Sequence, residues 1–143
     1  MKIYKMSYQD LDQVMDIENS SFKDPWKRDF FEHDLCRRSA MLFVAKEGPK
    51  VIGYIDAWLF GDELHLANIA VHPEFRRMGV GSKLLKKIIE LGKTKNAKYI
   101  VLEVRKSNFG AQKFYEKLGF KQYYLRPRYY SNGEDAIVYK LDL

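Results

Sequence analysis

The spacing of apolar residues changes several times along this chain, and each change predicts a new element. Residues 2–6 alternate between apolar and polar, which is typical of a short strand, and residues 11–17 then have the spacing of a helix. Ser7 and Asp10 match the capping box that opens such a helix. Residues 28–36 place their large apolar side chains on one side of a second short helix.

The next stretch predicts a three-stranded antiparallel meander. Residues 41–60 divide into two strands around residues 48–50, where a glycine and a proline fall together. A third strand, residues 63–71, follows a second glycine turn at residues 61–62.

Helices and strands alternate in the second half. Residues 84–91 have helical spacing, and residues 99–104 are apolar on both faces, as in a central strand. Residues 108–118 predict another helix that ends at a glycine. Two final strands, about residues 121–125 and 136–141, would pair as a hairpin. The fold class is therefore α/β or α+β, a sheet with helices on its faces.

Length and composition limit the class of protein. With 143 residues, 46% of them hydrophobic and 31% charged, we expect a single domain, residues 1–143, without a membrane-spanning segment. The absence of a signal-peptide pattern and the single cysteine, Cys36, favour the cytoplasm. The net charge of +6 favours an anionic partner, such as nucleic acid, a membrane surface or a phosphorylated small molecule. Because the cations are scattered, a solvated basic surface fits as well.

A glycine-rich turn lies between the third strand and the next helix. In VHPEFRRMGVGSKLL, residues 71–85, Arg76 and Arg77 precede Gly79 and Gly81. The helix N-terminus presents unpaired N–H groups and glycine lets a ligand approach them, so the stretch predicts an anion site. A P-loop would need lysine directly after Gly81, and a dinucleotide fingerprint a third glycine three residues after it; neither is present. A tight turn without a ligand accounts poorly for two glycines and two arginines together.

With NIAV before it and LEVRKSNFGAQKFYEKLGF after it, this turn resembles the GNAT superfamily of N-acetyltransferases, and within it the bacterial and archaeal enzymes that acetylate protein N-termini. The resemblance extends from DLDQVMDIENSSF to GEDAIVYKLDL. It implies the GNAT fold, a mixed central β-sheet of about six to seven strands flanked by about four helices. It also implies acetyl-CoA as cosubstrate and a protein N-terminal peptide as acceptor, for which the N-terminal alanine of ribosomal protein S18 is one candidate.

Within that resemblance, the strand, turn and helix would hold acetyl-CoA. The backbone of Ile69, Ala70 and Val71 would pair with the pantetheine arm. The pyrophosphate would lie on the loop formed by Arg76, Arg77, Met78, Gly79, Val80, Gly81 and Ser82. Asn108, at the start of the next helix, would make a second cofactor contact, although a plain N-cap role fits it equally well.

Two residues fit acid–base chemistry. Glu103 lies in an otherwise apolar strand, where burial would raise its pKa and make it a general base, directly or through water. The alternative for Glu103 is a pairing with Arg105 or a strand neighbour. The resemblance implies that Tyr115 protonates the departing thiolate, whereas its helix position alone fits core packing. The resemblance also implies that a backbone amide on the strand at residues 69–71, near a β-bulge, would polarise the thioester carbonyl.

No side chain fits an acyl-carrying nucleophile, so direct attack by the amine is expected. Cys36 lies in an amphipathic segment and is predicted to be a buried, inert thiol. His33, His65 and His72 lack the spacing of a metal site, and no metal is predicted.

The resemblance places two loops beside the acceptor, SSFKDPW and RPRYYSNGEDA. Trp26, Tyr129 and Tyr130 are candidates for contacts with an extended peptide, and they fit loop anchors on the core as well. Tyr-Tyr followed by GEDA favours protein N-termini, and Arg126 and Arg128 argue against a polyamine acceptor.

Other functions remain compatible with these motifs. The acceptor could be a small-molecule amine or a lysine side chain, since the same cofactor half would serve either. A non-catalytic acetyl-CoA-binding module or a basic ribosome-associated factor is a further alternative, against which Glu103 and Tyr115 together argue. No recognised motif predicts direct nucleic-acid binding, and no membrane partner is expected.

Overall fold

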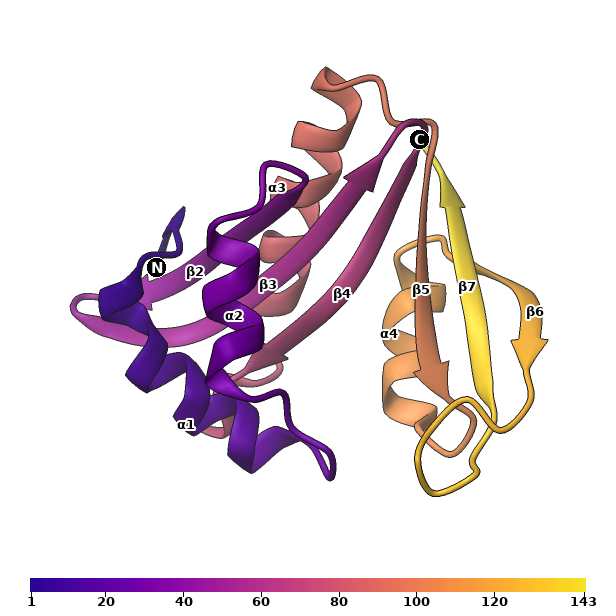
Figure 1. Ribbon diagram of the computed structural model, residues 1–143, viewed down its shortest axis with the longest axis horizontal. Helices are drawn as coiled ribbons and strands as arrows, with labels where there is room; N and C mark the ends of the chain where they lie inside the picture. The colour runs from indigo at the N-terminus through magenta and orange to yellow at the C-terminus, as the bar shows by residue number, and fades with distance from the viewer.

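The computed structural model describes residues 1–143. Seven strands form a mixed sheet in the order β1-β2-β3-β4-β5-β7-β6, and four α-helices cover it (Figure 1). The strands are β1 (Lys2–Lys5), β2 (Ala40–Glu47), β3 (Lys50–Phe60), β4 (Glu63–Val71), β5 (Tyr99–Arg105), β6 (Lys121–Arg126) and β7 (Ala136–Asp142). The helices are α1 (Leu11–Ser21), α2 (Arg28–Leu35), α3 (Val80–Thr94) and α4 (Phe109–Lys117), with 3₁₀ turns at Tyr8–Asp10 and Pro73–Phe75. The predicted fold class is confirmed.

Helices lie on both faces of the sheet. α1 and α2 pack in front of β2, β3 and β4, α3 packs behind the same strands, and α4 lies behind β5 (Figure 1). Side chains of α3 and α4, such as Leu84 and Tyr115, meet Leu102 of β5 in the larger core cluster. Leu11 and Phe31 belong to the smaller cluster under α1 and α2. No helix covers the front of β5, β7 and β6, so this part of the sheet is open.

β4 and β5 are parallel neighbours that separate along their length. They pair over three residues each, the last being His65 with Val101, and then diverge (Figure 1). In β4, Ala67 is an extra residue between Leu66 and Asn68, which pair with consecutive residues of β3. This β-bulge, which lies just before residues 69–71, bends the strand locally. The last part of β4 therefore has a free edge on the side of β5.

Some details differ from the expectations. The capping box of Ser7 and Asp10 opens a 3₁₀ turn before α1, with the Ser7 N–H donating to the Asp10 carboxylate at 2.9 Å. The prediction of a buried thiol was wrong, because Cys36 is exposed. It directly follows α2, whose buried residues are Phe31 and Asp34.

The carboxyl group of Asp56, on β3, is fully buried. No N–H or O–H group donates to its oxygens, and they face the carboxyl of Asp34 on α2. Burial, followed by the hydrogen bond to Asp34 and the charge of Asp34, raises the pKa of Asp56 to about 10. Asp56 is therefore a neutral acid at pH 7 and has a proton that it can donate to Asp34. In the unfolded protein Asp56 ionises near its ordinary pKa of 3.8, whereas in the folded protein it stays neutral up to about pH 10. The free energy of unfolding therefore falls as the pH rises between these two values.

We therefore expect Asp56→Asn to stabilise the protein by about 1–2 kcal/mol at neutral pH. An amide can donate to Asp34 without binding a proton, so the gain should grow as the pH rises. Urea unfolding at several pH values measures it, with Asp62→Asn, at an exposed position, as the control. A loss of stability, or a gain independent of pH, would contradict this account of Asp56.

Candidate active site

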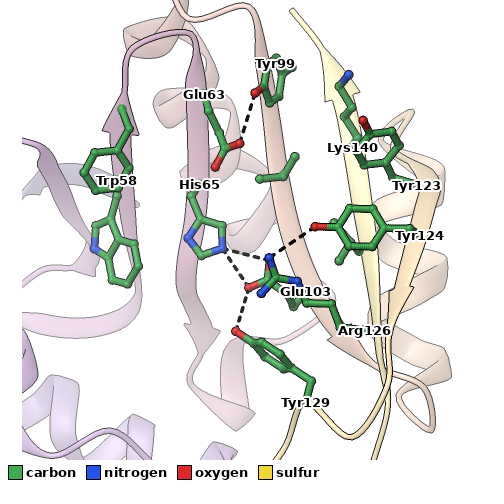
Figure 2. Close-up of a pocket in the computed structure, with 13 residues that line it drawn as sticks. Trp58, Glu63, His65, Tyr99, Glu103, Tyr123, Tyr124, Arg126, Tyr129 and Lys140 are labelled. Carbon is green, nitrogen blue, oxygen red and sulfur yellow. Dashed lines mark hydrogen bonds and ion pairs between the residues drawn. The ribbon is translucent and has the colours of Figure 1, made fainter.

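A cavity of about 570 Å³ opens on the uncovered face of the sheet, beside the paired ends of β4 and β5 (Figure 2). Side chains alternate along β5, so that Leu102 and Val104 point into the core and Glu103 points into the cavity. The walls are rich in aromatic rings. They consist of Trp58, Phe60, Glu63, His65, Tyr99, Val101, Glu103, Tyr123, Tyr124, Arg126, Tyr129, Val138 and Lys140.

Glu103 is held by side chains from other elements. Nε2 of His65, on β4, lies 2.9 and 3.0 Å from the two carboxylate oxygens, and the Tyr129 hydroxyl donates to Oε1 at 3.3 Å (Figure 2). Burial acts to raise the pKa of Glu103, but the hydrogen bond and charge of His65, with Arg126 and Tyr129, outweigh it and lower the pKa. The prediction of a raised pKa was wrong, because these partners come from distant parts of the chain. Glu103 is ionised at neutral pH and can accept a proton.

His65 is a site residue that the sequence analysis missed, since it weighed this histidine only as a metal ligand. In β4 it lies between Leu64 and Leu66, which are buried in the core, and therefore projects from the opposite face. Its ring packs against Trp58 at a centroid distance of 5.3 Å. Strand alternation could have shown its face. Its contact with Glu103 could not be found that way, because no local pattern shows that β4 and β5 are neighbours.

Tyr115 lies on α4, behind the sheet rather than in the cavity. It is buried in the core, with the rings of Phe120 and Tyr139 at 5.5 and 6.5 Å. Burial, and then the charge of Tyr130, raises the pKa of Tyr115. Burial also raises the pKa of Tyr130 to about 12, although the charge of Arg105 acts to lower it. The hydrogen-bond partners of Glu103 are His65 and Tyr129, so no hydrogen bond joins the two predicted catalytic residues.

The predicted anion loop joins β4 to α3. Arg77 and Gly79 have positive φ angles of 63° and 80°, and α3 then starts at Val80. Residues 76–79 are exposed, whereas Val80 is buried in the core and fixes the position of the helix start. No side chain caps the first turn of this 15-residue helix, so its N–H groups are available to an anion.

The flanks of the loop are formed by β4 and α1. The guanidinium of Arg76 is held back from the loop: its Nε donates to the carbonyl of Val71 at 3.1 Å, and it reaches the Ser21 hydroxyl at 3.4 Å. Ile69 and Ala70 pair with β3 but have no partner on the other side. Their free backbone groups suit pairing with an extended ligand.

α4 comes close to the loop from behind. A Cβ at position 81 would lie 3.4 Å from the ring of Phe114, whereas a Cβ at position 79 would meet nothing within 4 Å. Asn108 caps α4, accepting a hydrogen bond from the N–H of Ala111 at 3.1 Å. Its capping role is therefore observed, and its contact with a cofactor stays a prediction.

The three candidates for peptide contacts lie in different surroundings. Tyr129 is the one that lines the cavity, where its hydroxyl bonds to Glu103. Tyr130 is half-buried with its ring 4.0 Å from the guanidinium of Arg105. Trp26 is half-buried and stacks beside Trp58 at 6.5 Å, as a loop anchor would.

The sequence analysis predicted neither a metal site nor a membrane-spanning segment. No group of three or more His, Cys, Asp or Glu side chains is arranged to hold a metal ion, and the absence of a metal stays a prediction. None of the helices combines the length and the apolar character needed to cross a bilayer.

Comparison with known proteins shows the family to which this chain belongs. The model of the acetyltransferase (GNAT) family matches residues 11–120, from the start of α1 to the end of the α4 region. The chain belongs to the GNAT acetyltransferase family. It is therefore an acyltransferase, and the resemblance read from its motifs is confirmed. The matched residues include the anion loop, the free edge of β4 and Glu103.

Similar members of this family have names that state an acceptor. The N-alpha-acetyltransferase of Sulfurisphaera tokodaii is 35% identical over 142 residues, which cover 90% of this chain and 85% of the relative. The [ribosomal protein bS18]-alanine N-acetyltransferase of Salmonella typhimurium is 33% identical, covering 96% and 95%. The crystal structure of the ribosomal-protein-S18-alanine N-acetyltransferase from Escherichia coli has a TM-score of 0.89 and 31% identity, covering 99% of this chain and 92% of that one.

Proposed function

We propose that this GNAT enzyme transfers the acetyl group of acetyl-CoA to the α-amine of a protein N-terminus, with Glu103 as general base and Tyr115 as general acid. The observation that carries the proposal is the ionised Glu103, held by His65 and Tyr129 in an open cavity next to the gap between β4 and β5. The similar proteins named for N-alpha or S18-alanine acetylation support this class of acceptor. The N-terminal alanine of ribosomal protein S18 is the first acceptor to test.

The strand, loop and helix fit acetyl-CoA as cosubstrate. The N–H groups at the start of α3 would hold the pyrophosphate, with Arg77 adding positive charge, and the free edge of residues 69–71 would pair with the pantetheine arm. Acetyl-CoA bound there supplies an acetyl group activated as a thioester, with a thiolate as leaving group. The open space at Gly79 leaves room for a ligand at the backbone.

Glu103 is placed to take the proton of the attacking amine. An α-amine has an ordinary pKa of ~7.7–8.0, so a fraction is already neutral near pH 7 and the base has modest work to do. The lowered pKa of Glu103 keeps the carboxylate ionised. His65 contacts both of its oxygens and so fixes their orientation towards the cavity, where the proton can arrive directly or through one water.

Tyr115 has the protonation state that a general acid needs, since its raised pKa keeps the hydroxyl protonated. We expect Tyr115→Phe to lower kcat by about tenfold to a hundredfold, with an unchanged dissociation constant for acetyl-CoA. Steady-state rates and calorimetric titration measure the two effects. Tyr139→Phe, which also removes a phenol hydroxyl from the same cluster, should keep its kcat. If Tyr115→Phe retains full kcat, the tyrosine serves core packing alone.

The function itself is tested by offering acetyl-CoA with peptides that differ in the first residue, alongside spermidine and free lysine. Thiol release measures turnover, and mass spectrometry of the product locates the acetyl group. We expect peptides to be acetylated at the α-amine, including one with the N-terminal sequence of S18. Turnover with spermidine or lysine alone would refute the peptide acceptor. Cofactor binding without any turnover would indicate a non-catalytic module.

A further inference from the structure

Arg105 reaches both loops beside the cavity, and the mechanism above does not use it. It follows Glu103 by two residues on β5, so the two side chains project from the same face of the sheet. One guanidinium nitrogen lies 3.2 Å from Oδ2 of Asp24, in the loop between α1 and α2. Another lies 3.1 Å from Oε1 of Glu134 and 3.2 Å from Oδ1 of Asn132, in the loop between β6 and β7.

A second contact joins the two loops directly. The Ser131 hydroxyl donates to the same oxygen of Asp24 at 2.8 Å. We call Asp24, Arg105, Ser131 and Glu134 the loop clasp. The side chains of Arg105 and Glu134 are 20% and 18% exposed, so their ion pair is partly shielded from water, whereas Asp24 is 61% exposed. The ion pair of Arg105 with Glu134, in the loop between β6 and β7, is therefore stronger than its ion pair with Asp24, in the loop between α1 and α2.

The clasp is also connected to the candidate base. The guanidinium carbon of Arg105 lies 4.0 Å from the centre of the Tyr130 ring, within cation–π distance. Tyr130 packs edge-on against Tyr129 at 5.1 Å, and the Tyr129 hydroxyl bonds to Glu103 at 3.3 Å. Arg105 therefore contacts Tyr129 of the cavity wall through Tyr130, whereas His65 holds both oxygens of Glu103 independently of the clasp.

We propose, on the basis of the function proposed above, that Arg105 is a positioning residue that holds both loops in the arrangement that binds the acceptor peptide. Lysine cannot replace it, because the contacts to Asp24, Glu134 and Tyr130 diverge from one planar guanidinium, whereas an ammonium is a single point. A peptide that runs between the loops requires them in place. A small amine requires only Glu103 and the acetyl group.

The test compares Arg105→Lys with Arg38→Lys, a matched change at an exposed arginine that forms no ion pair. Rates are measured with an N-terminal peptide and with glycinamide, a small α-amine. For Arg105→Lys we expect the peptide KM to rise about tenfold, which is the effect of one lost charged contact. The kcat and the KM for glycinamide should stay near wild type, as should every constant of Arg38→Lys.

Two more variants test the connection between the loops. Asp24→Asn and Ser131→Ala should each raise the peptide KM by a smaller factor. Combined with Arg105→Lys, either should add little, because all three changes break the same clasp. An unchanged peptide KM for Arg105→Lys, or an equal loss of rate with peptide and glycinamide, overturns the proposal.

A measurement without any acceptor separates this proposal from the function on which it rests. Trypsin should cleave after Lys23 and Arg128, one in each loop, faster in Arg105→Lys than in wild type or Arg38→Lys, at an unchanged melting temperature. Unchanged cleavage rates overturn the clasp. If the wild-type enzyme acetylates no peptide while cleavage is accelerated, the clasp stands and the peptide acceptor is what fails.

Discussion

Glu103→Gln should lower kcat by about a thousandfold. Glutamine preserves the volume between His65 and Tyr129 and can still form hydrogen bonds with them, but it cannot accept the proton of the amine. The dissociation constant for acetyl-CoA should stay within about twofold of wild type, because the predicted cofactor loop lies on other elements. Initial rates at saturating acetyl-CoA measure the first effect, and calorimetric titration measures the second.

Glu90→Gln is the matched control, since Glu90 is exposed on α3, outside the cavity. It should behave as wild type. Activity of Glu103→Gln within about tenfold of wild type would show that the carboxylate is not the base. In that case the contact between His65 and Glu103 would serve to support the strands.

Gly81→Val should weaken the binding of acetyl-CoA by about a hundredfold or more, which corresponds to roughly 2.7 kcal/mol. Position 81 lies in the first turn of α3, and its side chain would project towards Phe114 at 3.4 Å, filling the space between α3 and α4 beside the free N–H groups. The backbone there is helical, and valine is at least as favourable as glycine in a helix, so the helix itself should not be weakened. Titration with acetyl-CoA and a thermal melt separate the two effects.

The structure favours Gly81 over Gly79 as the position for this substitution. Gly79 has a φ of 80°, a conformation that a β-branched residue adopts only with strain of about 1–3 kcal/mol, so a valine at position 79 would confound folding with binding. Lys86→Val places the same residue on the exposed side of α3 and should bind acetyl-CoA normally. Normal binding by Gly81→Val would remove the first turn of α3 from the cofactor site.

Much of the fold could be predicted because its signals are local. The alternation in residues 63–71, the helical spacing of residues 84–91 and the glycine after α4 each depend on neighbours within a few residues. The same is true of the anion loop, where glycines and a helix start are adjacent in the chain, and of Asn108, whose cap bond spans three residues.

The site depended on partners that are distant in the sequence. Glu103 could be picked out as a polar residue in an apolar strand, but the direction of its pKa shift follows from His65 and Tyr129, 38 and 26 residues away. Arg105 could be weighed only as a partner for Glu103, and it instead pairs with Asp24 and Glu134.

The sequence by itself determined the class of fold, the order of most elements, the glycine-rich turn before α3 and the family, because periodicity, turn residues and motifs act over short distances. The tertiary structure alone decided that β7 lies between β5 and β6, that β4 and β5 separate after His65, and that Arg105 joins two loops. These features arise when the strands align, since alignment sets which side chains meet across the sheet. Because of that alignment, Glu103 is ionised and Tyr115 lies behind the sheet.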